Sequence, residues 1–199
     1  MLRLLLPFLL VAITSVSHAL SFTSWEINEE WEDDKWTLEA TDDQNNYVEI
    51  SVNGQFIKGD RLRLIMKPSE GCDNSMMAAS FYTRMLDPEF ADIENQKISI
   101  EAFGVEMPAH ITHFTEMPHF GAYLGWIQLF FTEVEEMKEM LQLITEEFDA
   151  MQITLKPTED FKVDQHFDRL TNRWSMVGVS EAFDKTVKLC NRISEDIII

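Results

Sequence analysis

The chain has 199 residues, of which 45% are hydrophobic and 11% aromatic, and its formal net charge at pH 7 is −19. This apolar content is enough to build one core, so the composition excludes intrinsic disorder despite the charge. A surface this negative repels phosphates and anionic lipid headgroups, and the basic residues are interleaved with acids, so we expect no nucleic-acid binding.

The first nineteen residues have the pattern of a cleavable signal peptide. A basic start at Arg3 precedes an apolar run over 4–16, which is too short to span a bilayer stably, and the small residues of Ser17-His18-Ala19 favour cleavage after Ala19. We expect residues 20–199 to form a single globular domain that is periplasmic or secreted. No later apolar stretch has the length of a membrane helix, so we expect no transmembrane segment in the mature chain.

Trp25 and Trp31 follow the predicted cleavage site and lie among acidic residues. Exposed aromatic side chains in such a setting are typical of a surface that binds a protein partner or a sugar. The alternative is that these rings brace the edge of a sheet. Trp25 and Trp31 are therefore candidates for a partner surface.

Apolar and polar residues alternate along much of the segment between residues 36 and 103. The pattern is clearest at 47–52 and 61–66, and it continues at 78–84 and 97–103. A period of two predicts strands with one buried face and one wet face. Asn, Asp and Gly between the strands favour turns, so the N-terminal half is predicted to be an antiparallel meander.

The first of two predicted helices starts near Val134. Apolar residues recur at spacings of three and four as far as Phe148, which indicates an amphipathic helix. Thr132 and Glu135 have the spacing of a capping box at its start.

The rest of the C-terminal half predicts two strands and a second helix. Residues 151–155 and 173–177 alternate, and Ser180 is the expected cap of a helix that carries Phe183 and Cys190 on one face. The overall prediction is an α+β fold: a largely antiparallel sheet or sandwich of six to eight strands with two amphipathic helices in the C-terminal half.

Cys72 and Cys190 are the only cysteines of the chain. In an exported protein an even pair is more often a disulfide than two free thiols, so we expect a bond that ties the end of the chain to its middle. The alternative is two buried reduced thiols. Neither cysteine has the C-x-x-C spacing of a redox centre, so no catalytic thiol is expected.

The closing pattern Trp174-Ser175-Met176-Val177-Gly178-Val179-Ser180-Glu181-Ala182-Phe183, with Cys190 after it, resembles a known family. It is similar to the strand, glycine and helix ending of the invasion-associated locus B family of small exported bacterial proteins. The resemblance implies a secreted or periplasmic β-rich domain linked to host-cell interaction, without an agreed chemistry and with no functional residue to carry over. This chain departs from the family by lacking further cysteines in its front half.

A cluster of methionine and histidine is the one segment whose residue types suggest a binding site. Glu106-Met107-Pro108-Ala109-His110 is echoed by Glu116-Met117-Pro118-His119, with His113 between them. Thioether and imidazole together suit a soft or borderline ion, above all copper, and the candidate ligands are Met107, His110, His113, Met117 and His119. Against this, a regular strand points His110 and His113 to opposite faces, and methionine often fills gaps in a core. No cofactor is required by the sequence, and a periplasmic copper- or zinc-binding protein is the alternative function.

The chain has no G-x-S-x-G, no H-E-x-x-H and no glycine loop of the nucleotide-binding type. We therefore favour a non-enzymatic interaction protein that presents an acidic surface to a protein partner. A carboxylate-dependent hydrolase is a second alternative, because a fold with 35 acidic residues contains some pair of carboxylates at a suitable separation. No catalytic residue is singled out.

Overall fold

The computed structural model describes residues 36–40, 47–57, 59–85, 93–117 and 121–197. Several sequence predictions lie outside these residues: the signal peptide, the partner surface at Trp25 and Trp31, and the candidate ligand His119. Within the described part, the buried apolar side chains form one core that draws on both the N-terminal and the C-terminal half.

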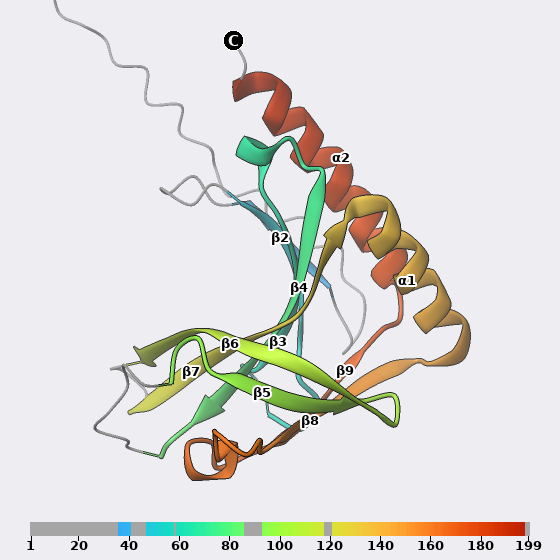
Figure 1. Ribbon diagram of the computed structural model, residues 1–199. Coiled ribbons are helices and arrows are strands. Elements are labelled where there is room, and N and C mark those ends of the chain that lie inside the picture. The colour runs from blue at the N-terminus through green and yellow to red at the C-terminus, as the bar shows by residue number, and fades with distance from the viewer. Residues whose placement is uncertain (1–35, 41–46, 58, 86–92, 118–120, 198–199) are drawn as a thin grey trace, which may run out of the picture.

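The described strands form one curved antiparallel sheet in the order β1-β2-β3-β4-β7-β6-β5-β8-β9 (Figure 1). Their bounds are β1 (Thr37–Ala40), β2 (Val48–Asn53), β3 (Arg61–Met66), β4 (Asn74–Thr83), β5 (Lys97–Ala102), β6 (Val105–Met117), β7 (Ala122–Glu133), β8 (Ala150–Lys156) and β9 (Thr171–Ser175). The antiparallel sheet and the α+β class agree with the sequence prediction. The strand count is higher than the six to eight expected.

The additional strands are β6 and β7, which occupy the Met/His segment and the apolar stretch after it. Val105, Met107 and Ala109 alternate with polar residues, but the prolines of the segment obscure that pattern. Pro108 pairs with Ser99 of β5, whereas the pairing of β6 with β7 begins only at His110. Pro108 thus lies where β6 has a neighbour on one side only, which is the setting in which a strand tolerates proline.

Helix α1 (Val134–Glu147) continues directly from β7 and buries Val134, Met137 and Leu141, the first part of the predicted apolar stripe. The stripe does not extend to Phe148 as predicted, because Phe148 is the C-cap residue and its side chain is exposed. The predicted capping box does not form. Glu133 is the N-cap residue without a capping side-chain bond, and the Thr132 hydroxyl donates to the carboxylate of Glu136 instead. Thr132 is still part of β7, so its backbone lies too early in the chain to cap the helix.

Helix α2 (Val179–Ile197) lies beside α1 and packs on β2 and on the short η1 helix (Pro68–Glu70) (Figure 1). It begins one residue before Ser180, so Ser180 is inside the helix and not its cap. Gly178, with φ of 75°, separates β9 from the helix, and its carbonyl accepts the amide of Ala182 at 3.0 Å. Within the described residues, neither helix combines the length and apolarity that crossing a bilayer requires.

The expected disulfide is present: Cys72 follows η1 and is bonded to Cys190 on α2. Both residues belong to the core cluster. The bond joins α2 to the β3–β4 connection, so it ties the end of the chain to the N-terminal half of the sheet, as the sequence predicts.

Strand β9, at one edge of the sheet, contacts the loop between β2 and β3 near the opposite edge. We call this contact the β9 closure. The amide of Gln55 donates to the carbonyl of Arg173 at 2.7 Å, and the Asn172 side chain donates to the Asp60 carboxylate at 2.8 Å. Gly54 permits this approach, because a Cβ at that position would lie 2.2 Å from the Asn172 side chain. Trp174 then packs edge-on against Phe81 inside the core.

Candidate functional site

The structure divides the predicted metal ligands between the two faces of β6. Met107 is half-buried and packs against the core, whereas His110 and His113 are exposed on the other face. The expectation that His110 and His113 point to opposite faces is wrong. A β-bulge inserts Thr112 between them, so that His110 pairs with Gln128 and His113 with Trp126, two residues apart on β7.

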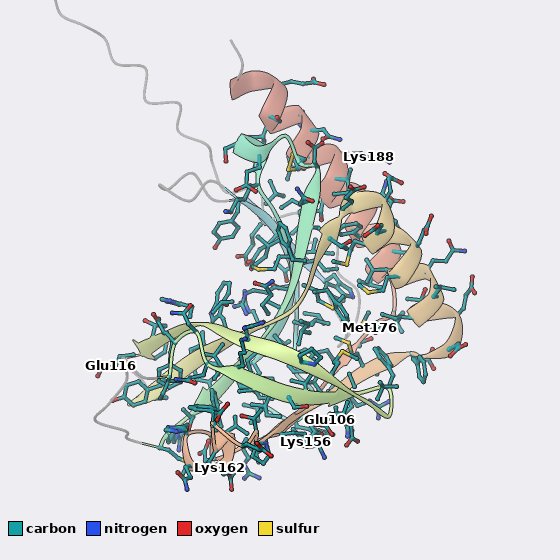
Figure 2. The ribbon with its side chains drawn as sticks, viewed as in Figure 1. Glu106, Glu116, Lys156, Lys162, Met176 and Lys188 are labelled. Atoms are coloured by element: carbon teal, nitrogen blue, oxygen red, sulfur yellow. A yellow bond between two sulfur atoms is a disulfide. The ribbon has the colours of Figure 1, made fainter. Side chains whose placement is uncertain are left out.

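The remaining candidate ligands lie elsewhere. Glu106 and Glu116, the neighbours of Met107 and Met117, are at opposite ends of β6 (Figure 2), and His119 is outside the described residues. Among the residues that the structure describes, no group of three or more His, Cys, Asp or Glu side chains is placed to hold a metal ion. Of the predicted ligands that the structure describes, His110 and His113 are the two in neighbouring positions on one face of β6.

Glu94 contacts His113, one member of this histidine pair. Its Oε1 atom lies 3.2 Å from Nδ1 of His113 and also accepts the backbone N–H of Phe114 at 2.9 Å. The backbone bond fixes the carboxylate, and the carboxylate in turn orients the His113 ring. No sequence pattern marks Glu94, because it lies 20 positions from Phe114 with strand β5 between them, and only the fold brings it to His113.

A buried ion pair lies on the sheet face that the sequence predicts to be wet. Glu49 and Arg63 are 3% and 8% exposed, and Arg63 Nε lies 3.5 Å from Glu49 Oε1. Arg63 also donates to the Ser80 hydroxyl at 2.8 Å, and its guanidinium lies 4.4 Å from the ring centroid of Trp126. Burial raises the pKa of Glu49 and lowers that of Arg63, with each charge partly offsetting the shift of the other. The two opposite charges stabilise each other inside the fold, and because both side chains are buried they are not accessible to a ligand.

Asp60 is a second buried acid, at the β9 closure. Its carboxylate accepts the Tyr82 amide at 2.6 Å and the Asn172 side chain at 2.8 Å. Burial raises the pKa of Asp60 to about 6, against the lowering effect of these two hydrogen bonds. Because Asp60 is fully buried, its carboxylate has a structural role: it joins the Tyr82 backbone to the Asn172 side chain.

Three turns bring apolar side chains to one end of the sheet, where Phe103 is partly buried and the others are exposed. The β5–β6 turn supplies Phe103 and Val105, the α1–β8 connection supplies Phe148, and the β9–α2 connection supplies Val177. We call these four residues the turn-end patch. Phe103 and Phe148 pack with ring centroids 4.9 Å apart, and Val105, Phe148 and Val177 are 58%, 39% and 57% exposed.

Pairing explains why the three turns meet. Phe103 and Gly104 both have positive φ and form a tight turn, while Ala102 before them pairs with Ile153 of β8. The amide of Met176 donates to the carbonyl of Asp149 at 2.8 Å, which holds the start of β8 against the end of β9. Figure 2 shows Met176 below α1, near these strand ends.

Carboxylates border the turn-end patch. Helix α1 ends with Glu146 and Glu147, has no basic residue in its last turn, and is followed by Asp149. The negative end of the helix dipole adds to these charges, an arrangement that costs stability. Among the cations of the neighbouring strands, Arg173 of β9 is exposed and lies opposite Gln152, whereas Lys156 at the far end of β8 is engaged by Glu101 at 2.9 Å. The patch therefore combines apolar surface with a local excess of negative charge.

Comparison of the chain with protein-family models, curated proteins and solved structures finds no match. Its function therefore has to be inferred from the chemistry of its own surface.

Proposed function

We propose that this chain is an exported interaction protein that docks a cationic, partly apolar polypeptide segment at the turn-end patch. The observation that supports the proposal is the gathering of Phe103, Val105, Phe148 and Val177 from three separate turns. Isolated apolar side chains are common on protein surfaces, but a group of them bordered by polar residues is typical of an interaction site. The disulfide fits an oxidising compartment.

The charge around the patch specifies the occupant. Glu146, Glu147 and Asp149 lie beside it, and the exposed acids Glu135, Glu136 and Glu139 continue along α1. Three carboxylates beside a helix C-terminus attract Lys or Arg and repel an acidic partner. A bound segment would place apolar side chains against Phe148 and Val177 and its cationic side chains against the end of α1.

A peptide selection tests the proposal without assuming a sequence. A phage-displayed random peptide library is selected on the purified protein, and affinities of the enriched peptides are measured by fluorescence anisotropy. We expect the peptides to combine Lys or Arg with large apolar residues. The Phe148→Ser/Val177→Ser variant should bind them at least tenfold more weakly, because it removes the apolar contact while leaving the charge unchanged.

The control separates docking at the patch from general attraction to an acidic protein. Glu146→Gln/Glu147→Gln/Asp149→Asn and Glu135→Gln/Glu136→Gln/Glu139→Gln each remove three charges from one helix region. Only the first triple variant should weaken binding by several-fold. Equal effects of the two triple variants, or full binding by Phe148→Ser/Val177→Ser with its circular dichroism spectrum intact, would contradict the proposal.

A further inference from the structure

The β-bulge in β6 creates a pair of exposed imidazoles on one face of the sheet. Ile111 pairs with Ile127 and His113 with Trp126, so Thr112 is the extra residue, and its hydroxyl donates to the Trp126 carbonyl at 3.3 Å. His110 and His113 thereby take positions equivalent to i and i+2 of a regular strand, about 7 Å apart along it. Both side chains are exposed, and the ring of His113 is held by its contact with Glu94.

The contact with Glu94 orients the imidazole ring of His113. Its carboxylate, fixed by the amide of Phe114, lies 3.2 Å from Nδ1 of His113. A histidine that donates its Nδ1–H to a carboxylate presents the Nε2 lone pair outward and gains basicity, which is the arrangement found behind most histidine ligands of metal ions. The side chain of His113 is 57% exposed, so Nε2 is accessible from solvent.

We infer that His110 and His113 form a divalent transition-metal site on the outer face of β6, with Glu94 as the positioning residue of His113 and water completing the coordination. Two nitrogen ligands without a thioether select Cu(II) over Cu(I), and Cu(II) over Zn(II) at equal supply. Met107 is excluded from the site because it points to the core face.

The charges around the histidine pair have opposing effects on the binding of a cation. Lys97 of β5 lies directly opposite His110 and opposes a cation there, while Glu94 and the net charge of −19 favour it. Gln128, the partner of His110 on β7, is neutral. The site is therefore expected to bind a divalent ion as an exchangeable ligand, without the closed coordination shell of a structural zinc site.

Copper titration of the protein without a polyhistidine tag tests this inference. We expect one Cu(II) ion to bind, measured by calorimetry, with imidazole nitrogen coupling in the electron paramagnetic resonance spectrum. His110→Ala and His113→Ala should each weaken binding at least tenfold. Glu94→Gln should weaken it by about 10-fold while keeping the imidazole signal, because outer partners of metal ligands have effects of that size.

Three further variants separate this site from other sources of copper binding. Met107→Leu, His119→Ala and His166→Ala should leave the affinity unchanged. Equal Cu(II) affinity in wild type and in His110→Ala/His113→Ala would overturn the inference, and so would loss of binding in His119→Ala or Met107→Leu alone. Peptide binding at the turn-end patch is measured separately, so failure of either proposal leaves the other intact.

Discussion

At the scale of single residues, Asp60 makes the stability of the fold depend on pH. Its carboxylate is fully buried between the Tyr82 amide and the Asn172 side chain, and its pKa is raised from an ordinary value of 3.8 to about 6. Because the folded state holds the proton more tightly than the unfolded state, this residue contributes more stability as the pH falls from about 6 toward 4. Above about pH 6 its contribution is constant.

We expect the Asp60→Asn variant to lose that gain. Over the pH range 7 to 4, the free energy of unfolding of the wild type should rise relative to that of the variant by up to about 3 kcal/mol, which corresponds to a shift of about two pKa units. Urea unfolding at a series of pH values measures the difference. Asp168→Asn, which changes a nearby exposed acid, is the control and should show little of the effect. A difference between wild type and Asp60→Asn that does not change with pH would refute the assignment.

Glu49 and Arg63 show at the same scale how a charged pair is accommodated. The Ser80 hydroxyl and the Trp126 ring supply contacts that water would otherwise make, which offsets part of the desolvation cost. Glu49 Oε2 and Arg63 Nε lack hydrogen-bond partners among the described residues, so that compensation is incomplete. The pair therefore contributes little net free energy to folding, and its main effect is to hold β2, β3 and β7 in one arrangement.

At the scale of elements, Gly125 controls how β7 meets the segment that connects β8 to β9. It lies opposite Phe81 on β4 and Phe114 on β6, and the Phe167 ring fills the space above it. A Cβ on Gly125 would lie 2.6 Å from Phe167 Cζ. Phe167 is nearly fully buried and packs edge-on against Phe114, so its ring has no free space to move into.

The Gly125→Ala variant should therefore be destabilised by about 1 to 3 kcal/mol through overpacking. Thermal or urea unfolding measures the loss. In the Phe167→Leu background, which shortens the side chain above the glycine, the same substitution should cost less than half as much. Equal costs in the two backgrounds would show that the contact between Gly125 and Phe167 does not limit packing at this point.

The β6 bulge is the element that most affects the surface chemistry. A single inserted residue, Thr112, reverses the facing of every β6 residue that follows it relative to a regular strand. Phe114 consequently points into the core, where it stacks with Tyr123, and His113 points outward beside Glu94. The proposed metal site and the core packing of β6 thus depend on the same β-bulge.

At the scale of the whole molecule, the disulfide and the β9 closure join distant parts of the chain. The bond between Cys72 and Cys190 spans a sequence separation of 118 residues, and both residues are buried. Loop-closure entropy assigns a bridge of this length about 5 kcal/mol, most of it through the unfolded state. Strain and residual unfolded structure reduce that value, so it is an upper figure.

We expect the Cys72→Ala/Cys190→Ala variant to fold with an unfolding free energy lower by about 2 to 5 kcal/mol. Dithiothreitol alone should reduce the native protein slowly, because Cys190 is fully buried, and quickly in the presence of urea. Denaturant titration and thiol labelling measure the two effects. Fast reduction of the native protein, or a double variant as stable as the wild type, would contradict this role of the bond.

The sequence by itself determined the features that depend on neighbours along the chain. Alternation at Val48, Ile50 and Val52 and the three-and-four spacing from Val134 predicted strands and helix, because burial of one face follows directly from those periods. The disulfide was predictable because only two cysteines are available to pair. The antiparallel α+β class followed from these local patterns.

The tertiary structure alone decided which surfaces come together. The common face of His110 and His113 depends on a register shift against β7, and the burial of Glu49 and Arg63 depends on contacts with Trp126, far away in sequence. Phe103 and Phe148 meet, with Val177 in the adjacent β9–α2 connection, only because β5, β8 and β9 pair at one end of the sheet. Such long-range pairing is set by the packing of the whole core, which local periodicity does not encode.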